Sequence, residues 1–257
     1  MNWKQTLFWS FSAAAIFYYF LLFGVFVFVG QEEMQLFIPE WWYIREFLFQ
    51  PGGFCAVAGQ WIIQYYRQPM SAVVFHTVLL VGCGFMVYRI LRCFSDKTYL
   101  LFLSLLPVLY LVKMSIHGEY LVDGTVGVVL MLLALSVSLK VRRAGSIAGY
   151  GIASTLFLCG LTGLLSVCYA FLYTLLALLR YKTSRQRLAA SACLIPALFI
   201  YLFSGWLGIP VPLSDGWMPE AYLEIQRLPH YYMYRVWTFF TLSIVGVALF
   251  SYSRSEE

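Results

Sequence analysis

The sequence predicts an all-α polytopic membrane protein, a transmembrane helical bundle with about eight membrane segments. Hydrophobic residues make up 61% of the 257 positions and charged residues 11%, whereas about 25% are charged in an ordinary soluble domain. The mean hydropathy is +0.78. The apolar runs reach the roughly 20 residues that a helix needs to cross a bilayer. They lack period-two alternation, so a transmembrane barrel is disfavoured.

The charge pattern orients the predicted bundle. The net charge is +5, but the basic residues are divided among short loops between apolar runs. An excess of Lys and Arg in such loops marks the cytoplasmic side, so no nucleic-acid partner is expected. We expect a multi-pass protein of the inner membrane with both termini in the cytoplasm and with membrane lipids as its surroundings.

The predicted segments form a single transmembrane domain, 1–257. Residues 8–29 resemble a signal peptide but are too long and lack a cleavage site, so they are read as an uncleaved first span. The run 147–179 is split at Gly160-Leu161-Thr162-Gly163 into a short helical hairpin, which either crosses as two thin spans or re-enters. The other predicted spans are 70–91, 99–112, 122–139, 188–207 and 236–252.

The external loop 31–69 is the only long segment between apolar runs that is both charged and aromatic. Residues 40–49 carry Trp, Tyr, Glu and Arg side chains, a mixture typical of a helix lying in the membrane interface. Residues 54–67 show apolar side chains at helical spacing. We therefore expect two juxtamembrane helices, joined at Pro51-Gly52-Gly53.

Six isolated cysteines are present, without the paired spacing of a zinc site. Only Cys55 would lie on the external side, so we predict no disulfide framework and small buried side chains for the other five.

The predicted span centres contain no Asp, Glu, Lys or Arg, which disfavours an ion-coupled transporter. The polar residues that could carry chemistry belong instead to the external loops 31–69, 113–123 and 208–235. They are Glu32, Glu33, Arg67, His117, Glu119, Asp123, Arg227 and His230.

Glu32 and Glu33 are the predicted catalytic residues, because an acid at a water–membrane boundary can act as a general base or hold a divalent metal such as Mg or Mn. Alternatively, they stabilise the start of the next helix through its dipole.

The other loop residues are predicted to bind substrate. His117, Glu119 and Asp123 are spaced two and four residues apart and could ligate a metal or contact a phosphate group, although such residues also occur in any polar loop. Arg67 and Arg227 could hold an anionic head group or simply reach lipid phosphates. His230 belongs to the same external side.

His76 falls inside the predicted span 70–91. A single histidine on an apolar helix is more often a hydrogen-bonded packing residue than a site residue.

Several motifs resemble those of an uncharacterised family of multi-spanning membrane proteins of Bacteroidota. They are Glu33-Met34-Gln35-Leu36-Phe37, Arg45-Glu46-Phe47-Leu48-Phe49-Gln50-Pro51-Gly52-Gly53-Phe54, Gln64-Tyr65-Tyr66-Arg67-Gln68-Pro69 and Gly118-Glu119-Tyr120-Leu121-Val122-Asp123-Gly124, with the break at 160–163. The resemblance covers most of the chain and implies a family without an assigned function.

The layout more loosely resembles the type C membrane glycosyltransferases that use a polyprenyl-phosphate-linked sugar. That resemblance implies an acid at Glu32 or Glu33, with Arg67, His117 or Arg227 at the donor phosphate. The alternatives are a non-catalytic subunit or scaffold of a cell-envelope complex, with other envelope subunits as partners, and a lipid or solute transporter. An enzyme should gather these side chains in one cleft, whereas a scaffold should scatter them and expose an aromatic face.

Overall fold

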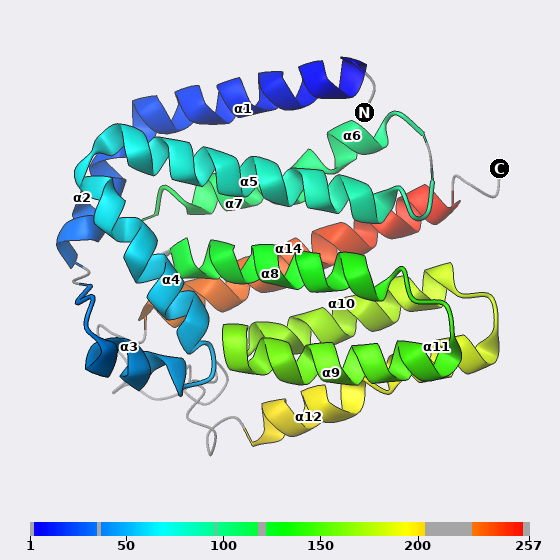
Figure 1. Cartoon of the computed structure of the whole chain (residues 1–257). Helices are drawn as coiled ribbons and strands as arrows, with labels where there is room; N and C mark the ends of the chain where they lie inside the picture. The colour runs from blue at the N-terminus through cyan, green and yellow to red at the C-terminus, as the bar shows by residue number, and fades with distance from the viewer. Residues whose placement is uncertain (1–2, 35–36, 96, 118–121, 204–227, 254–257) are drawn as a thin grey trace.

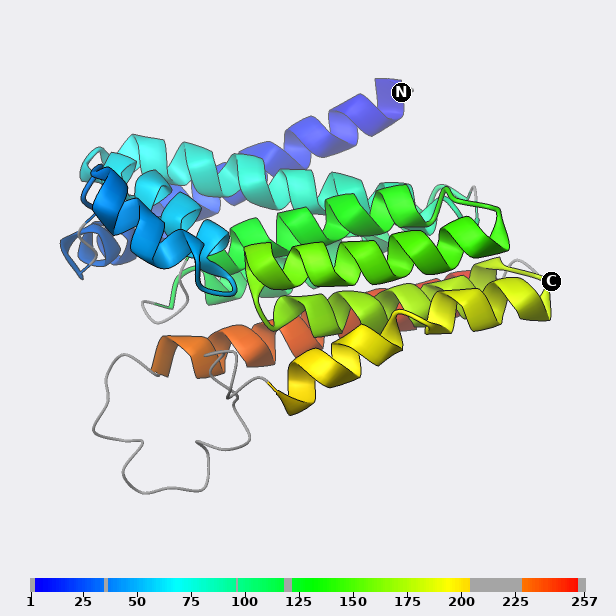
Figure 2. The ribbon, with the colours of Figure 1, turned by 60° about the horizontal axis from the view of Figure 1, so that its bottom comes forward.

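The computed structural model describes residues 3–34, 37–95, 97–117, 122–203 and 228–253. These residues form helices and connecting turns, without a strand in the described ranges. The long helices lie side by side in a bundle, and α3 and α4 lie together at one end of it (Figures 1 and 2). The protein is therefore all-α, as predicted.

The first part of the chain forms one outer helix, a group of short helices and one long helix. The bounds are α1 Trp3–Phe23, α2 Val25–Met34, α3 Trp41–Leu48, α4 Gly53–Ile63, the 3-10 helix η1 Gln64–Arg67, and α5 Pro69–Leu91. The predicted span 70–91 and both predicted juxtamembrane helices correspond closely to these elements.

The remaining helices run back and forth along the bundle (Figure 1). They are α6 Leu100–Leu103, α7 Leu105–Met114, α8 Val122–Ser138, α9 Ala144–Thr162, α10 Leu165–Arg180, α11 Ser184–Ser191, α12 Leu194–Leu202 and α14 Leu228–Ser253. The predicted break in 147–179 is present between α9 and α10. α9 is longer than the short helix that the sequence predicted there.

Three helices are long and apolar enough to cross a membrane: α1, α5 and α9. Four further apolar helical stretches are shorter and lie in α6–α7, α8, α10 and α14: Leu100–Met114, Val122–Ser138, Leu165–Arg180 and Val236–Phe250. Length and composition together define a helical membrane protein.

Prolines account for two interruptions along the bundle. Pro107 follows the junction of α6 and α7, and Pro196 lies in the first turn of α12. Proline has no backbone N–H, so it cannot bond to the carbonyl four residues earlier. The predicted spans 99–112 and 188–207 are therefore each divided into two helices.

The two ends of the bundle differ. At the basic end lie the start of α1, the end of α14, residues 92–95 and 97–99, and the loops 140–143 and 181–183 (Figure 1). Two of these loops are joined by hydrogen bonds: Tyr181 Oη donates to the Val141 carbonyl at 2.7 Å, and Gln186 Nε2 donates to the Arg142 carbonyl at 2.6 Å. At the other end, the capped end, α2, α3, α4 and η1 lie beside the starts of α5 and α8 (Figure 1).

Buried side chains of α5, α8 and α10 lie in the core of the bundle. The parallel rings of Tyr169 and Tyr173 on α10 have centroids 5.8 Å apart. The Tyr169 hydroxyl lies 2.7 Å from the Ser138 hydroxyl of α8. Each of these polar groups is satisfied within the core, as a low-dielectric interior requires.

Two glycine turns lock the capped end onto the bundle. The Gly52 N–H donates to the Gly160 carbonyl at 3.0 Å. A Cβ at Gly52 would lie 3.3 Å from the Gly163 nitrogen. Gly52 and Gly163 have φ angles of 86° and 62°, a region that favours glycine. The Pro51-Gly52-Gly53 turn thus fits directly against the break between α9 and α10.

We expect Gly163→Ala to lower the free energy of unfolding by about 1–3 kcal/mol, the cost of holding a side chain in a sparsely populated backbone conformation. Thermal unfolding of the detergent-solubilised protein measures this. Gly149→Ala is the control, because Gly149 lies within α9 with no atom within 4 Å of an added Cβ. Equal melting temperatures for the two variants would contradict the prediction.

Candidate functional site

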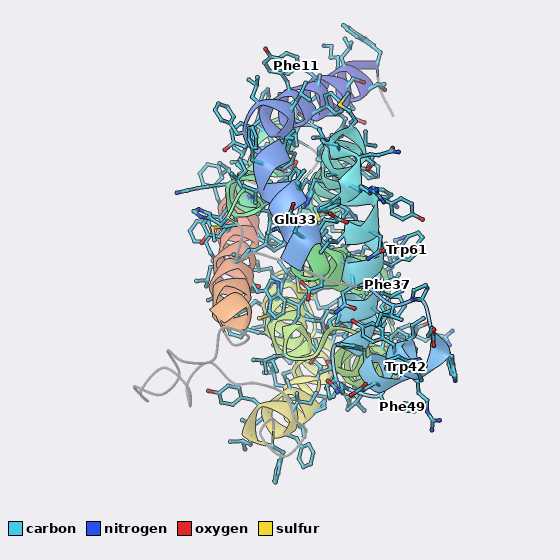
Figure 3. All side chains as sticks on the ribbon, turned by 90° about the vertical axis from the view of Figure 1, so that its left-hand side faces the viewer. Phe11, Glu33, Phe37, Trp42, Phe49 and Trp61 are labelled. Atoms are coloured by element: carbon cyan, nitrogen blue, oxygen red, sulfur yellow. The ribbon has the colours of Figure 1, made fainter. Side chains whose placement is uncertain are left out.

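The predicted catalytic pair lies in the last turn of α2. Glu32 is half-buried and Glu33 is exposed. Viewed along the bundle, Glu33 lies near the middle of the capped end (Figure 3). The next described helix, α3, begins only at Trp41, so the alternative that the two acids stabilise a helix start is wrong. An acid in a last helical turn instead meets the negative end of the dipole.

Two of the predicted substrate-binding residues lie at the same end on other elements. Arg67 is the exposed last residue of η1, and His117 is exposed beyond the end of α7. α2 packs against η1, which places Arg67 on an element next to the two acids. None of these side chains makes a hydrogen bond or ion pair with another described side chain. The structure thus brings them to one end without joining them.

Other predicted residues fall beyond what the structure describes. Glu119 and Arg227 lie outside the described ranges, and His230 lies in α14 with its side chain outside the description. Among the described residues, no group of three or more His, Cys, Asp or Glu side chains could hold a metal ion.

Asp123 differs from Glu32 and Glu33 because it lies against a neighbouring helix, α4. It lies in the first turn of α8, where a negative charge is favoured, and its Oδ1 accepts a hydrogen bond from the Gly124 N–H at 2.7 Å. α4 crosses directly over it, because a Cβ at Gly59 would lie 2.7 Å from the Asp123 Cβ. The carboxyl group is half-buried. Burial, and secondarily the charge of Asp123, raises the pKa of the Cys55 thiol.

A buried polar pair lies where α1, α2, η1 and α5 meet. The Tyr66 hydroxyl is 2.7 Å from His76 Nε2, and the Phe28 ring stacks on the imidazole with centroids 4.3 Å apart. Burial raises the pKa of Tyr66, so the phenol keeps its proton. His76 Nδ1 has no hydrogen-bond partner among the described residues. The structure gives His76 the packing role that the sequence favoured.

Sequence reasoning missed Tyr66 as the partner of His76 and Gly59 as the contact of Asp123. A signal existed only for Gly59. Small residues at Gly52, Cys55 and Gly59 recur along one side of α4, and such spacing marks close helix packing in membrane proteins.

The capped end also carries exposed aromatic side chains. Trp41, Trp42 and Phe49 are 69%, 58% and 80% exposed, and Trp61 on α4 is 49% exposed. Trp42, Phe49 and Trp61 lie at the outer margin of the bundle in the view along it, away from Glu33 (Figure 3). Glu33 and these aromatic side chains therefore occupy different parts of the same end.

These features define a class, a polytopic helical membrane protein with a layer of short helices over one end of its bundle. Comparison with protein families then identifies the group: the chain belongs to the family of unknown function DUF6057, which matches residues 1–257. No curated protein and no solved structure matches it.

The Tyr66–His76 hydrogen bond can be measured by a double-mutant cycle with Tyr66→Phe and His76→Phe, each of which keeps a ring in place. Buried side-chain hydrogen bonds in membrane proteins couple by about 0.6–1.7 kcal/mol. We expect a coupling in this range from unfolding in detergent. Tyr65→Phe, at the exposed neighbouring residue, should be neutral, and strictly additive effects of the pair would contradict the hydrogen bond.

Proposed function

We propose that this protein is a non-catalytic subunit of a cell-envelope complex in the inner membrane, crossing it about eight times with both termini in the cytoplasm. The basic end supports this orientation, because the start of α1 and the end of α14 lie there together with Lys140, Arg142 and Arg143 (Figure 1). Lys and Arg in short loops favour the cytoplasmic side. The capped end then faces outward.

The observation that carries the proposal is the separation of the candidate polar side chains at the capped end. Glu33, Arg67 and His117 are each exposed on a different element, without a polar contact to a described side chain. A catalytic site requires such groups to be held together in a fixed geometry. Separate exposed charges of both signs are better suited to selecting a partner by electrostatic complementarity. The expected partner is an envelope protein with a charged external surface.

Charge reversal at the capped end should release that partner. We expect Arg67→Glu to shift the protein, solubilised from its native membranes, to a smaller size on native gels, because like charges across an interface cost several kcal/mol. Lys140→Glu makes the same charge change at the basic end and should leave the size unchanged. A wild-type protein that already migrates alone would refute the proposal.

A second candidate function rests on Asp123. A half-buried carboxyl group at the proposed outer face, fixed by Gly124 and covered by α4 at Gly59, is a possible general base. In a type C glycosyltransferase-like enzyme it would take the proton of an acceptor hydroxyl. The acceptor oxygen would form a bond to the anomeric carbon of the sugar while the bond from that carbon to the polyprenyl phosphate breaks, releasing the lipid phosphate. Among the described acids, this one is held most firmly by the fold.

The enzyme candidate has its own test. Protein reconstituted in vesicles with a polyprenyl-phosphate-linked sugar and a membrane extract as acceptor should release the lipid phosphate. Asp123→Asn should reduce that rate about 10²–10⁴-fold, the contribution of a general base. Glu40→Gln, at an exposed acid outside the candidate catalytic and binding residues, is the control and should keep the rate. No release by the wild-type protein would eliminate the glycosyltransferase.

A further inference from the structure

The short helix α3 uses little of its surface to contact the rest of the protein. None of its residues is buried. It packs against α4 from one side, where Tyr43 Oη donates to Gln60 Oε1 at 3.1 Å. Within α3, the Tyr43 and Phe47 rings pack with centroids 4.9 Å apart. The opposite side remains uncovered by the described chain.

The uncovered side combines large aromatic groups with charged side chains, and the exposed Glu40 carboxylate accepts a hydrogen bond from the Trp42 indole N–H. Trp41, Trp42 and Phe49 are mostly exposed, and the exposed Arg45 and Glu46 lie among them in the helix. The Arg45 guanidinium is 5.6 Å from the centre of the Phe49 ring. Trp rings are enriched at the head-group level of membranes, and an Arg side chain near an interface can extend its guanidinium to the lipid phosphates.

The position of α3 indicates which medium meets this side. Its Trp42 and Phe49 lie at the outer margin of the capped end, whereas Glu33 lies near the middle (Figure 3). The 23 residues of α5 extend about 34 Å at 1.5 Å per residue, enough to cross a hydrocarbon core of about 30 Å. α3 lies at the same end of the bundle as the start of α5, on the opposite edge of that end (Figure 1). At this level a side chain at the margin meets lipid head groups, and one near the middle meets water.

We propose that α3 is an in-plane anchor that binds zwitterionic phospholipid head groups of the membrane in which the bundle lies. Trp41, Trp42 and Phe49 insert below the head groups. Arg45 contacts the lipid phosphate and Glu46 contacts the ammonium group of the same layer. The two carboxylates of this side, Glu40 and Glu46, outnumber its one guanidinium. This side therefore repels an anionic head group and favours a zwitterionic one.

The anchor also orients the rest of the capped end. Tyr43 links α3 to α4, and the Gly52 N–H links the start of α4 to the Gly160 carbonyl of α9. α4 is thus held from both sides, by the membrane through α3 and by the bundle through α9. The anchor requires only the protein and lipid, so it does not depend on any protein partner.

The test places the photoreactive residue benzoylphenylalanine at position 49 of the full chain, reconstituted without other proteins in phosphatidylcholine vesicles. Position 33, near the middle of the capped end, is the water-facing control. Position 157 is the lipid control, because Phe157 is 68% exposed on α9, one of the three candidate spans. Intact mass spectrometry detects phospholipid adducts.

We expect phospholipid adducts at positions 49 and 157 and none at 33. Adducts at 157 without adducts at 49 would overturn the proposal, and so would cross-links from 49 to a second copy of the chain. Phosphatidylglycerol vesicles test the head-group assignment, since the adduct yield at 49 should fall there while that at 157 stays constant. An equal yield at 49 in both lipids would overturn the zwitterionic preference. Because each probe replaces an exposed side chain, folding should be retained.

Discussion

The close approach of two glycine turns determines how the capped end is built. The Gly52 N–H bonds to the Gly160 carbonyl, and an added Cβ at Gly52 would lie 3.3 Å from the Gly163 nitrogen. This contact holds the start of α4 against the break between α9 and α10. From there α4 crosses α8 at Gly59, which leaves Asp123 half-buried beneath it. A side chain at Gly59 would collide with Asp123, and one at Gly52 would crowd the Gly163 backbone.

The contact between the two glycine turns also explains how the helix break between α9 and α10 is tolerated. A helix break inside a bilayer exposes N–H and C=O groups that lipid cannot satisfy, so it is tolerated only against protein or water. At the end of α9, the Pro51-Gly52-Gly53 turn supplies a hydrogen-bond donor: the Gly52 N–H donates to the Gly160 carbonyl. The 31–69 segment is therefore part of the fold and more than a connection between two spans.

Local sequence signals predicted the elements well. Pro69 and the apolar run after it placed α5, the Pro51-Gly52-Gly53 turn separated α3 from α4, and the glycines at 160 and 163 predicted the break before α10. Each signal depends on the conformation of one residue or on a short periodic pattern. The helix breaks near Pro107 and Pro196 also depend on single residues, but the sequence prediction treated each pair of helices as one continuous span.

Contacts between distant segments could not be predicted in this way. Tyr66 meets His76 because η1 folds back onto α5, and Asp123 meets Gly59 because α4 lies across α8. A single sequence contains no period or spacing that pairs such residues. The candidate site was accordingly predicted as a set of residue types on the external side, and Glu33, Arg67 and His117 do lie at one end, each exposed.

The composition of the 31–69 segment does not show which of its residues would meet lipid and which would meet water. Its charged and aromatic residues are mixed in the sequence, but the fold places Trp42 and Phe49 at the margin of the capped end and Glu33 near its middle (Figure 3). Lipid surrounds the margin of a membrane bundle, and water covers the middle of its end. The aromatic residues at the margin are therefore poor candidates for recognising a soluble partner, and Glu33 is a poor candidate for lipid contact. The proposed binding of other envelope proteins would fall to the middle of this end, and the proposed contact with lipid to its margin.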